Sequence, residues 1–247
     1  MHTLVIVPTY NEAKNIGEVL RRARAASPDA DILVVDDESP DGTADRADAA
    51  AAELGGVHVL RRKGRAGFGD AYRAGFTWGL DRGARVLVQM DADLSHDPAM
   101  LPALVAGLSD HDLVVGSRYV PGGSVAQWTR RRRFLSRAGN MYARFMLGLG
   151  LHDVTSGFRA YRADLFRSID LNKVRADGYG FQIEMAYLAS QRGARMKEIP
   201  IRFLDRERGQ SKMSGAIVTE AMKLVTKWGL ARMLDKVRGV KQSSGFS

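Results

Sequence analysis

The stretch RVLVQMDADLSH, residues 85–96, shows the pattern on which this fold depends: an apolar run that ends abruptly in carboxylates. Short apolar runs of this kind are typical of strands that are buried on both faces of a sheet. Four other runs in the first half are similar, at 3–8 (TLVIVP), 31–36 (DILVVD), 57–60 (VHVL) and 112–116 (DLVVG). Helical patterns separate them, at 13–26, 42–54, 67–82 and 98–108. This alternation predicts an α/β sandwich around a mainly parallel sheet.

The second half of the chain is less regular. A turn at 121–123 (PGG) leads into a basic and apolar segment at 128–149 with helical spacing. We expect strands at 158–162 and 196–204, and helices at 181–192 and 215–237. The sequence contains no internal repeat and no low-complexity linker. We therefore interpret residues 1–238 as one domain and residues 239–247 as a flexible tail.

Composition excludes several classes of protein. Hydrophobic residues make up 45% of the 247 residues and charged residues 26%, which is ordinary globular usage. The absence of cysteine excludes disulfides, thiolate zinc sites and cysteine nucleophiles. We see no secretory leader and no uninterrupted apolar run of about 20 residues. Any contact with a membrane is therefore expected from its surface, directly or through a membrane-anchoring partner protein.

The net charge of +9 is unevenly distributed. Residues 1–112 hold 12 Lys and Arg against 18 Asp and Glu, whereas residues 113–247 hold 25 against 10. Between Leu113 and His152 there are seven arginines and no acidic residue. A charged stretch is usually a solvated surface, but one without counter-charges favours an anionic partner such as nucleic acid, acidic lipid or a phosphate ligand.

Carboxylates follow three of the predicted strands: Glu12 the first, Asp36 and Asp37 the second, and Asp91 and Asp93 the fourth. Ligands of open α/β sheets bind at the carboxyl ends of the strands, so these side chains should share one rim. Asp91 and Asp93 could bind Mg²⁺ or Mn²⁺ together with substrate phosphates. A D-x-D triplet by itself is weakly specific, and the alternative is a turn that caps the next helix. Taken alone, Asp36 and Asp37 fit a turn better than a ligand site.

Seven motifs then resemble, in order, those of family 2 glycosyltransferases with the GT-A fold. They are PTYNE (8–12), VVDDESPDGT (34–43), MDADLSH (90–96), GSRYV (116–120), SGFRAYR (156–162), GYGFQIEM (178–185) and RERGQSK (206–212). Within that family the chain is similar to the polyprenyl-phosphate (dolichyl-phosphate) mannose synthases. Each motif is modest alone, but seven in order are highly specific. The resemblance implies a GT-A Rossmann-like sandwich with a mainly parallel mixed sheet, and it favours the metal interpretation of Asp91 and Asp93.

The resemblance also implies roles for individual residues. The nucleotide base would lie among Pro8, Tyr10, Glu12, Val35 and Asp37, where Glu12 or Asp37 can accept hydrogen bonds from guanine. Asp91 and Ala92 would contact ribose and phosphate. Asp93 would hold the metal, with Ser95 as a further ligand, directly or through water. Arg118, Arg206, Ser211 and Lys212 would contact phosphates. Asp91, Asp93 and Arg118 are therefore the expected catalytic residues.

The implied reaction moves mannose from GDP-mannose to a polyprenyl phosphate, with inversion at the anomeric carbon. A phosphate monoester is largely ionised at neutral pH, with a second pKa of about 6, so the acceptor needs no general base. Holding the metal, neutralising charge and aligning the acceptor are sufficient. Transfer of glucose, or transfer to another lipid phosphate, is the alternative within this class. Glu184 fits equally a residue that orients sugar hydroxyls and a helix-surface carboxylate.

Two segments suggest contact with an anionic membrane. Residues 128–149 combine Arg130–Arg133 with Trp128, Phe134, Met141 and Phe145, which is typical of an interfacial helix. The helix at 215–237 places Ile217, Ala221, Leu224, Trp228 and Ala231 on one stripe, which fits a core helix equally well. We expect amphipathic interfacial helices and a peripheral location on the cytoplasmic face of a membrane. A basic nucleic-acid-binding module is the alternative from another class. It leaves the acidic rim unexplained, so no nucleic acid partner is expected.

Overall fold

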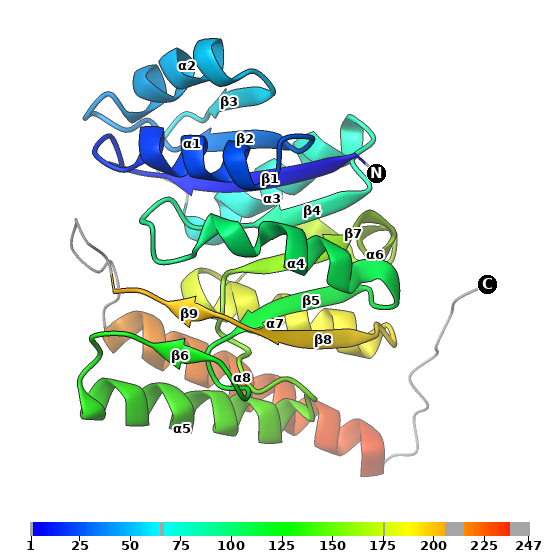
Figure 1. Ribbon diagram of the computed structural model, residues 1–247. Helices are drawn as coiled ribbons and strands as arrows, with labels where there is room; N and C mark the ends of the chain where they lie inside the picture. Colours follow the sequence, from blue (N-terminus) through cyan, green and yellow to red (C-terminus); the bar gives the residue numbers. More distant parts are fainter. Residues whose placement is uncertain (1, 65–66, 175, 206–214, 238–247) are drawn as a thin grey trace.

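A seven-stranded sheet, in the order β3-β2-β1-β4-β7-β5-β8, runs through the computed structural model (Figure 1). The structure describes residues 2–64, 67–174, 176–205 and 215–237. The strands are β1 (Thr3–Thr9), β2 (Asp31–Asp36), β3 (Val57–Arg61), β4 (Val86–Gln89), β5 (Leu113–Ser117), β7 (Arg159–Arg162) and β8 (Met196–Pro200). Only β7 is antiparallel to its neighbours in this sheet. The prediction of an α/β fold with a mainly parallel mixed sheet is confirmed.

Helices cover both faces of this sheet. They are α1 (Ile16–Ala26), α2 (Thr43–Leu54), α3 (Phe68–Asp81), α4 (Leu101–Ala106), α5 (Arg130–Leu147), α6 (Ala163–Arg167), α7 (Gly178–Gln191) and α8 (Gly215–Val237). The short 3₁₀ turns η1 (Pro98–Met100) and η2 (Gly107–Ser109) flank α4, and η3 (Leu171–Lys173) precedes α7. The predicted tail at 239–247 lies outside the described residues, as do Arg206, Ser211 and Lys212.

Side chains that alternate along each strand build two separate cores. In β1, Leu4 and Ile6 pack with α3 and α7, whereas Val5 and Val7 pack with α1 and α4. Successive residues of a strand point to opposite faces, so a continuous apolar strand supplies both cores. Figure 1 shows the resulting three layers of helix, sheet and helix.

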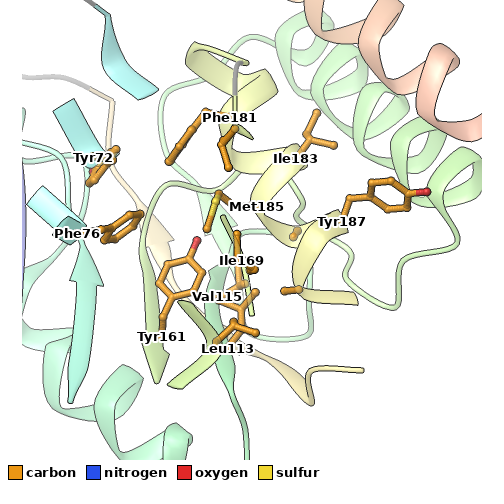
Figure 2. Packing of buried hydrophobic residues seen from close by; sticks show 14 of the residues in the cluster. Tyr72, Phe76, Leu113, Val115, Tyr161, Ile169, Phe181, Ile183, Met185 and Tyr187 are labelled. Carbon is orange, nitrogen blue, oxygen red and sulfur yellow. The ribbon is translucent and has the colours of Figure 1, made fainter. Parts of the chain in front are cut away.

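Aromatic rings and small residues hold α3 against the sheet. The rings of Tyr72 and Phe181 are stacked with centroids 6.0 Å apart, which joins α3 to α7 (Figure 2). Gly79 lies where α3 meets two strands: a Cβ there would be 2.6 Å from Leu4 Cδ2 and 2.7 Å from Leu87 Cδ2. No real Cβ makes contacts this short, so the helix approaches this closely only because the residue is glycine.

One predicted strand is interrupted. Residues 196–204 form β8 and then β9 (Arg202–Phe203), which leaves the main sheet to pair with β6 (Ser124–Val125). Pro200 has no N–H to donate to a ladder, and the next N–H, that of Ile201, donates to the carbonyl of Ser117 at 3.0 Å. The chain then passes from pairing with β5 to pairing with β6 at Ile201, whose carbonyl accepts from the N–H of Ser124 at 3.0 Å. The short elements β6, α6 and η3 were not predicted.

Helices α5 and α8 lie side by side at one end of the molecule (Figure 1). Tyr142 and Thr226 share a hydrogen bond of 2.7 Å between them. Of the predicted stripe, Ala221 is buried and Ala231 is exposed; Val225 is also buried, so α8 docks partly as a core helix. Both helices also expose large apolar side chains: Phe134, Leu135, Met141 and Phe145 in α5, and Val218, Leu230, Met233 and Leu234 in α8. No helix in the described part of the chain is long and apolar enough to cross a membrane.

Candidate active site

A cavity of about 510 Å³ opens at the carboxyl ends of the parallel strands. Strands β2 and β4 flank β1 on opposite sides, so the strand order reverses beside β1, the place where open α/β sheets bind ligands. Eight of the predicted site residues line this cavity: Pro8, Tyr10, Glu12, Asp37, Asp91, Ala92, Asp93 and Arg118. Another hollow, of about 570 Å³, is lined mainly by α1 and α2, and also by Leu94 of the loop after β4.

Asp91 and Asp93 follow β4 and are held by short-range contacts. The hydroxyl of Tyr72 donates to Asp91 Oδ1 at 3.3 Å, and the backbone N–H of Asp91 donates to Nδ1 of His96 at 3.1 Å. Asp93 is 4% exposed, and its Oδ1 accepts from the N–H of Ser95 at 3.0 Å. Burial, and then the charge of Asp91, raises the pKa of Tyr72 well above its usual value, so this hydroxyl stays a donor.

The alternative in which these aspartates cap the next helix does not hold. Asp97 itself caps η1, because its side chain accepts from the N–H of Ala99 at 3.0 Å. The turn made by Asp93 and Ser95 is local and leaves both aspartates lining the cavity. The D-x-D pair therefore forms part of the cavity wall.

The donor atoms at this end of the cavity fit a hard divalent cation. Asp91 and Asp93 supply carboxylate oxygens, and Ser95 Oγ is buried with no hydrogen-bond partner among the described residues. Ser95 does not itself line the cavity. In the described ranges no cluster of three or more His, Cys, Asp or Glu could enclose a metal by itself. One or two carboxylates plus ligand phosphates is the usual set for Mg²⁺, so the residues present fit such an ion.

Arg118 follows β5 and is paired with a buried carboxylate. Its Nε and Nη2 donate to the two oxygens of Asp153 at 2.7 and 2.6 Å, and Nη2 also donates to Thr155 Oγ1 at 2.8 Å. Burial by itself lowers the pKa of Arg118, but the attraction of Asp153 outweighs it, and the pKa lies above its ordinary value. Arg118 therefore stays a cation at the cavity wall, although much of its guanidinium is used within the protein.

The predicted base pocket is only partly reproduced. Asp37 lies 3.1 Å from Nη1 of Arg62, an ion pair that sequence reasoning missed. Glu12 accepts a hydrogen bond of 2.9 Å from Nδ2 of Asn15. Val35 is fully buried in the core that packs with α3 and does not line the cavity. Its position in the strand points its side chain to the helix layer, so it is not placed to contact a base.

Several lining residues were not predicted. They are His96, Trp128, Arg132, Thr155, Ser156, Gly157, Tyr179, Gln182, Phe203 and Asp205, among others. Residues 155–157 precede β7, and because β7 is antiparallel its beginning meets the rim where the other strands end. The motifs at 156–162 and 178–185 were the available signal. Glu184, the residue singled out in the second of these motifs, instead accepts from the N–H of Ala176 at 3.0 Å and does not line the cavity.

A Rossmann-like sheet with an acidic cavity at its switch point is the architecture of a GT-A glycosyltransferase. Comparison with known families agrees, because the profile described as Glycosyl transferase family 2 matches residues 4–170. The chain belongs to this family, and it is a glycosyltransferase. The enzyme interpretation is confirmed over that of a nucleic-acid-binding module.

Three relatives make the similarity more specific. An undecaprenyl-phosphate mannosyltransferase of Micrococcus luteus is 53% identical over 238 residues, covering 96% of this chain and 98% of that protein. A polyprenol monophosphomannose synthase of Mycolicibacterium smegmatis is 51% identical, covering 96% of this chain and 91% of that protein. A dolichol-phosphate mannosyltransferase of Pyrococcus furiosus is 35% identical over 90% of this chain and 62% of that protein.

Solved structures share the fold. Glucosyl-3-phosphoglycerate synthase from Mycobacterium tuberculosis, in complex with Mn²⁺, uridine diphosphate and phosphoglyceric acid, superposes with a TM-score of 0.71 at 20% identity. The match covers 92% of this chain and 78% of that one. At this identity the likeness establishes the GT-A architecture alone.

Proposed function

We propose that this protein transfers mannose from GDP-mannose to a polyprenyl phosphate, with inversion at the anomeric carbon. The observation that best supports a lipid acceptor is the placement of α5. Trp128, just before α5, and Arg132, in its first turn, line the cavity, while Phe134, Met141 and Phe145 farther along the helix are about 70% exposed. A lipid whose chain lies along that apolar surface would present its phosphate to the cavity. The two most similar mannosyltransferases described above support mannose and a polyprenyl phosphate as substrates.

The guanine base would lie near Glu12 and Asp37. Carboxylate oxygens only accept hydrogen bonds, and guanine presents adjacent N–H donors that uracil and cytosine do not present in that arrangement. Both residues line the cavity, at the end formed by β1 and β2. Arg62 beside Asp37 would hold its carboxylate in place.

Asp91 and Asp93, with Ser95 behind them, would hold Mg²⁺ or Mn²⁺. Such an ion neutralises the charge that develops on a leaving diphosphate. Tyr72 and His96 keep Asp91 in position through their hydrogen bonds to its side chain and backbone.

In the transfer step, an oxygen of the acceptor phosphate forms a bond to the anomeric carbon while the bond from that carbon to the diphosphate breaks. The electron pair of the broken bond leaves with GDP. The acceptor is already ionised, so no residue has to remove a proton. Arg118 and Arg132 would supply positive charge for the acceptor phosphate. Their Cζ atoms lie 5.5 and 4.0 Å from the centroid of the Trp128 ring. This positioning and charge neutralisation would carry the catalysis.

Attachment to the membrane would come from α5 and α8. Arg130, Arg131 and Arg133 are exposed on α5 beside the exposed apolar side chains. Basic and apolar residues together bind an anionic lipid surface. We propose that the protein lies peripherally on the cytoplasmic face of a membrane, with a membrane-anchoring protein as a further partner.

The proposal is tested with purified protein, Mg²⁺ or Mn²⁺, and a polyprenyl phosphate in vesicles. GDP-mannose, GDP-glucose and UDP-glucose are supplied in separate reactions, and the lipid product is identified by mass and by digestion with α- and β-mannosidases. We expect β-linked polyprenyl-phosphate mannose from GDP-mannose alone. A glucosylated lipid as the main product would instead establish a polyprenyl-phosphate glucose synthase.

A further inference from the structure

The side-chain amide of Gln182 is buried in the cavity wall without a hydrogen-bond partner. Gln182 lies in α7, is 1% exposed and lines the cavity. Neither its Nε2 nor its Oε1 forms a hydrogen bond with any part of the chain that the structure describes. Native proteins pair nearly all buried polar groups, because an unpaired one lowers stability. An amide unpaired in the wall of a ligand cavity therefore points to a partner on the ligand.

The backbone of Gln182 is anchored by a buried arginine, which fixes where its side chain leaves α7. Arg159 is fully buried and donates from Nη1 to the carbonyl of Gln182 at 2.7 Å. The same guanidinium donates from Nε to the carbonyl of Ser156 and from Nη2 to that of Val154, both at 2.7 Å. Phe181 and Ile183, on either side of Gln182, are anchored in the apolar core (Figure 2). Such preorganisation is what a group that recognises a ligand requires.

The amide shares a small space with the carboxylate of Asp91. Gly157 lies between them: a Cβ there would be 3.6 Å from Gln182 Nε2 and 3.5 Å from Asp91 Oδ1. With no side chain at 157, that space is left to a ligand. Asp91 lies at the proposed phosphate end of the donor, and the sugar is the next group along a sugar nucleotide. The group that would reach Gln182 is therefore the transferred sugar.

We propose that Gln182 hydrogen-bonds two neighbouring hydroxyls of the transferred sugar and thereby helps to select it. The NH₂ group donates to one hydroxyl oxygen, while the carbonyl oxygen accepts from the adjacent hydroxyl. A sugar lacking one of these hydroxyls leaves half of the buried amide unpaired. Sites built in this way discriminate strongly against the incomplete substrate. The inference rests on the proposed function, because it takes the ligand to be a sugar nucleotide.

The test is Gln182→Met, a substitution of similar length that removes both the donor and the acceptor. It is assayed with GDP-mannose and with GDP-mannose analogues that each lack one ring hydroxyl. We expect kcat/KM for GDP-mannose to fall at least about tenfold, the scale of one lost hydrogen bond. For an analogue that lacks one contacted hydroxyl, the substitution should lower kcat/KM clearly less than for GDP-mannose, because only one of the two hydrogen bonds is left to lose. The Kd of GDP, which carries no sugar, should be unchanged.

Gln191→Met is the matched control, because it is the same change in the same helix at a residue outside the cavity lining. Unfolding in urea supplies a second readout. Removal of an unpaired amide should leave stability equal or higher. A clear loss of stability in Gln182→Met would show that the amide has a partner within the protein, and the inference would fail. It would also fail if activity with every donor were unchanged, or if only the KM for the lipid acceptor rose.

The outcome for the proposed function is read separately, from the donor that the unaltered protein prefers. Should that donor be a glucose nucleotide, the same comparison is made with its deoxy analogues. If GDP-mannose is not a substrate, the proposed sugar is wrong. If Gln182→Met has no effect that depends on a particular hydroxyl, Gln182 does not recognise the sugar.

Discussion

Arg118 and Asp153 form a buried ion pair 35 residues apart in the chain, in which the backbone N–H of Arg118 also donates to Asp153 Oδ2 at 2.9 Å. The pair joins the rim of β5 to the loop that enters β7. Arg118 is thus a positioning residue as well as a cation of the site. Its substitution is expected to affect stability before it can be interpreted as loss of a phosphate contact.

Arg118→Met should lower the free energy of unfolding by about 3–5 kcal/mol at neutral pH, because it leaves the Asp153 carboxylate buried without its main cation. Burial alone would raise the pKa of Asp153, and Arg118 reverses this and lowers it. In the original protein, the lowered pKa of Asp153 adds stability at any pH above its unfolded-state pKa of about 3.9. This contribution is lost as the pH falls through the pKa of Asp153 in the folded state. In the variant, a raised pKa lets Asp153 become neutral on mild acidification. The loss of stability should therefore be smaller near about pH 4 than near about pH 7. Urea unfolding at both pH values tests this, and an equal loss at both would contradict it.

Asp93→Asn should remove the metal-dependent part of GDP binding and leave the fold intact, because the amide loses the charge that attracts the cation but keeps the acceptor for Ser95 N–H. Calorimetry of GDP binding with and without Mn²⁺ gives the result. Asp97→Asn is the control, since this exposed residue caps η1 outside the cavity lining and asparagine is an equally good cap. Retention of full Mn²⁺-dependent binding by Asp93→Asn would exclude Asp93 as a ligand.

Replacement of Arg130, Arg131 and Arg133 together by Gln should release the protein from anionic vesicles. Each basic residue near such a surface contributes about 1 kcal/mol, so the three changes should weaken partitioning more than about a hundredfold. Arg132 is left unchanged because it lines the cavity. Vesicle sedimentation at low and high salt is the measurement, with weaker binding of the original protein expected at high salt.

The control for this change is the loss of three exposed charges elsewhere, Arg21, Arg22 and Arg167 to Gln. Transfer to a short, water-soluble acceptor phosphate should be retained by both triple variants. Undiminished binding of the α5 variant to vesicles would move the attachment to α8 or to a partner protein.

Two glycines should respond in opposite ways to the same change. Gly79→Ala should lower the free energy of unfolding by about 1–3 kcal/mol, because the new methyl group would overlap Leu4 and Leu87. Gly139→Ala, within α5, should raise it by about 0.5–1 kcal/mol, since a Cβ there meets nothing within 4 Å and alanine favours the helix. Thermal or urea unfolding of the two variants measures this. A stabilised Gly79→Ala would contradict the close packing of α3.

The strand ends at Asp37, Asp91 and Arg118 could be predicted from sequence because each follows a parallel strand, and parallel strands end on one edge. The cavity residues before β7 could not be predicted in this way. They lie at the rim because β7 runs antiparallel to β4 and β5. This direction depends on pairing between segments about 45 to 75 residues apart in the chain. Gln182 lies inside the helix predicted at 181–192, but only tertiary packing decides that its side chain faces the cavity.

The sequence by itself determined the alternation of strands and helices and the acidic rim, because apolar periodicity and the residues that follow a strand are local properties of the chain. The tertiary structure alone decided which polar side chains remain for a ligand. Arg118 finds its carboxylate at Asp153, and Gln182 reaches the cavity unpaired. These outcomes depend on contacts between distant segments, and burial makes each of them energetically decisive: a buried polar group must be paired within the protein or by what it binds.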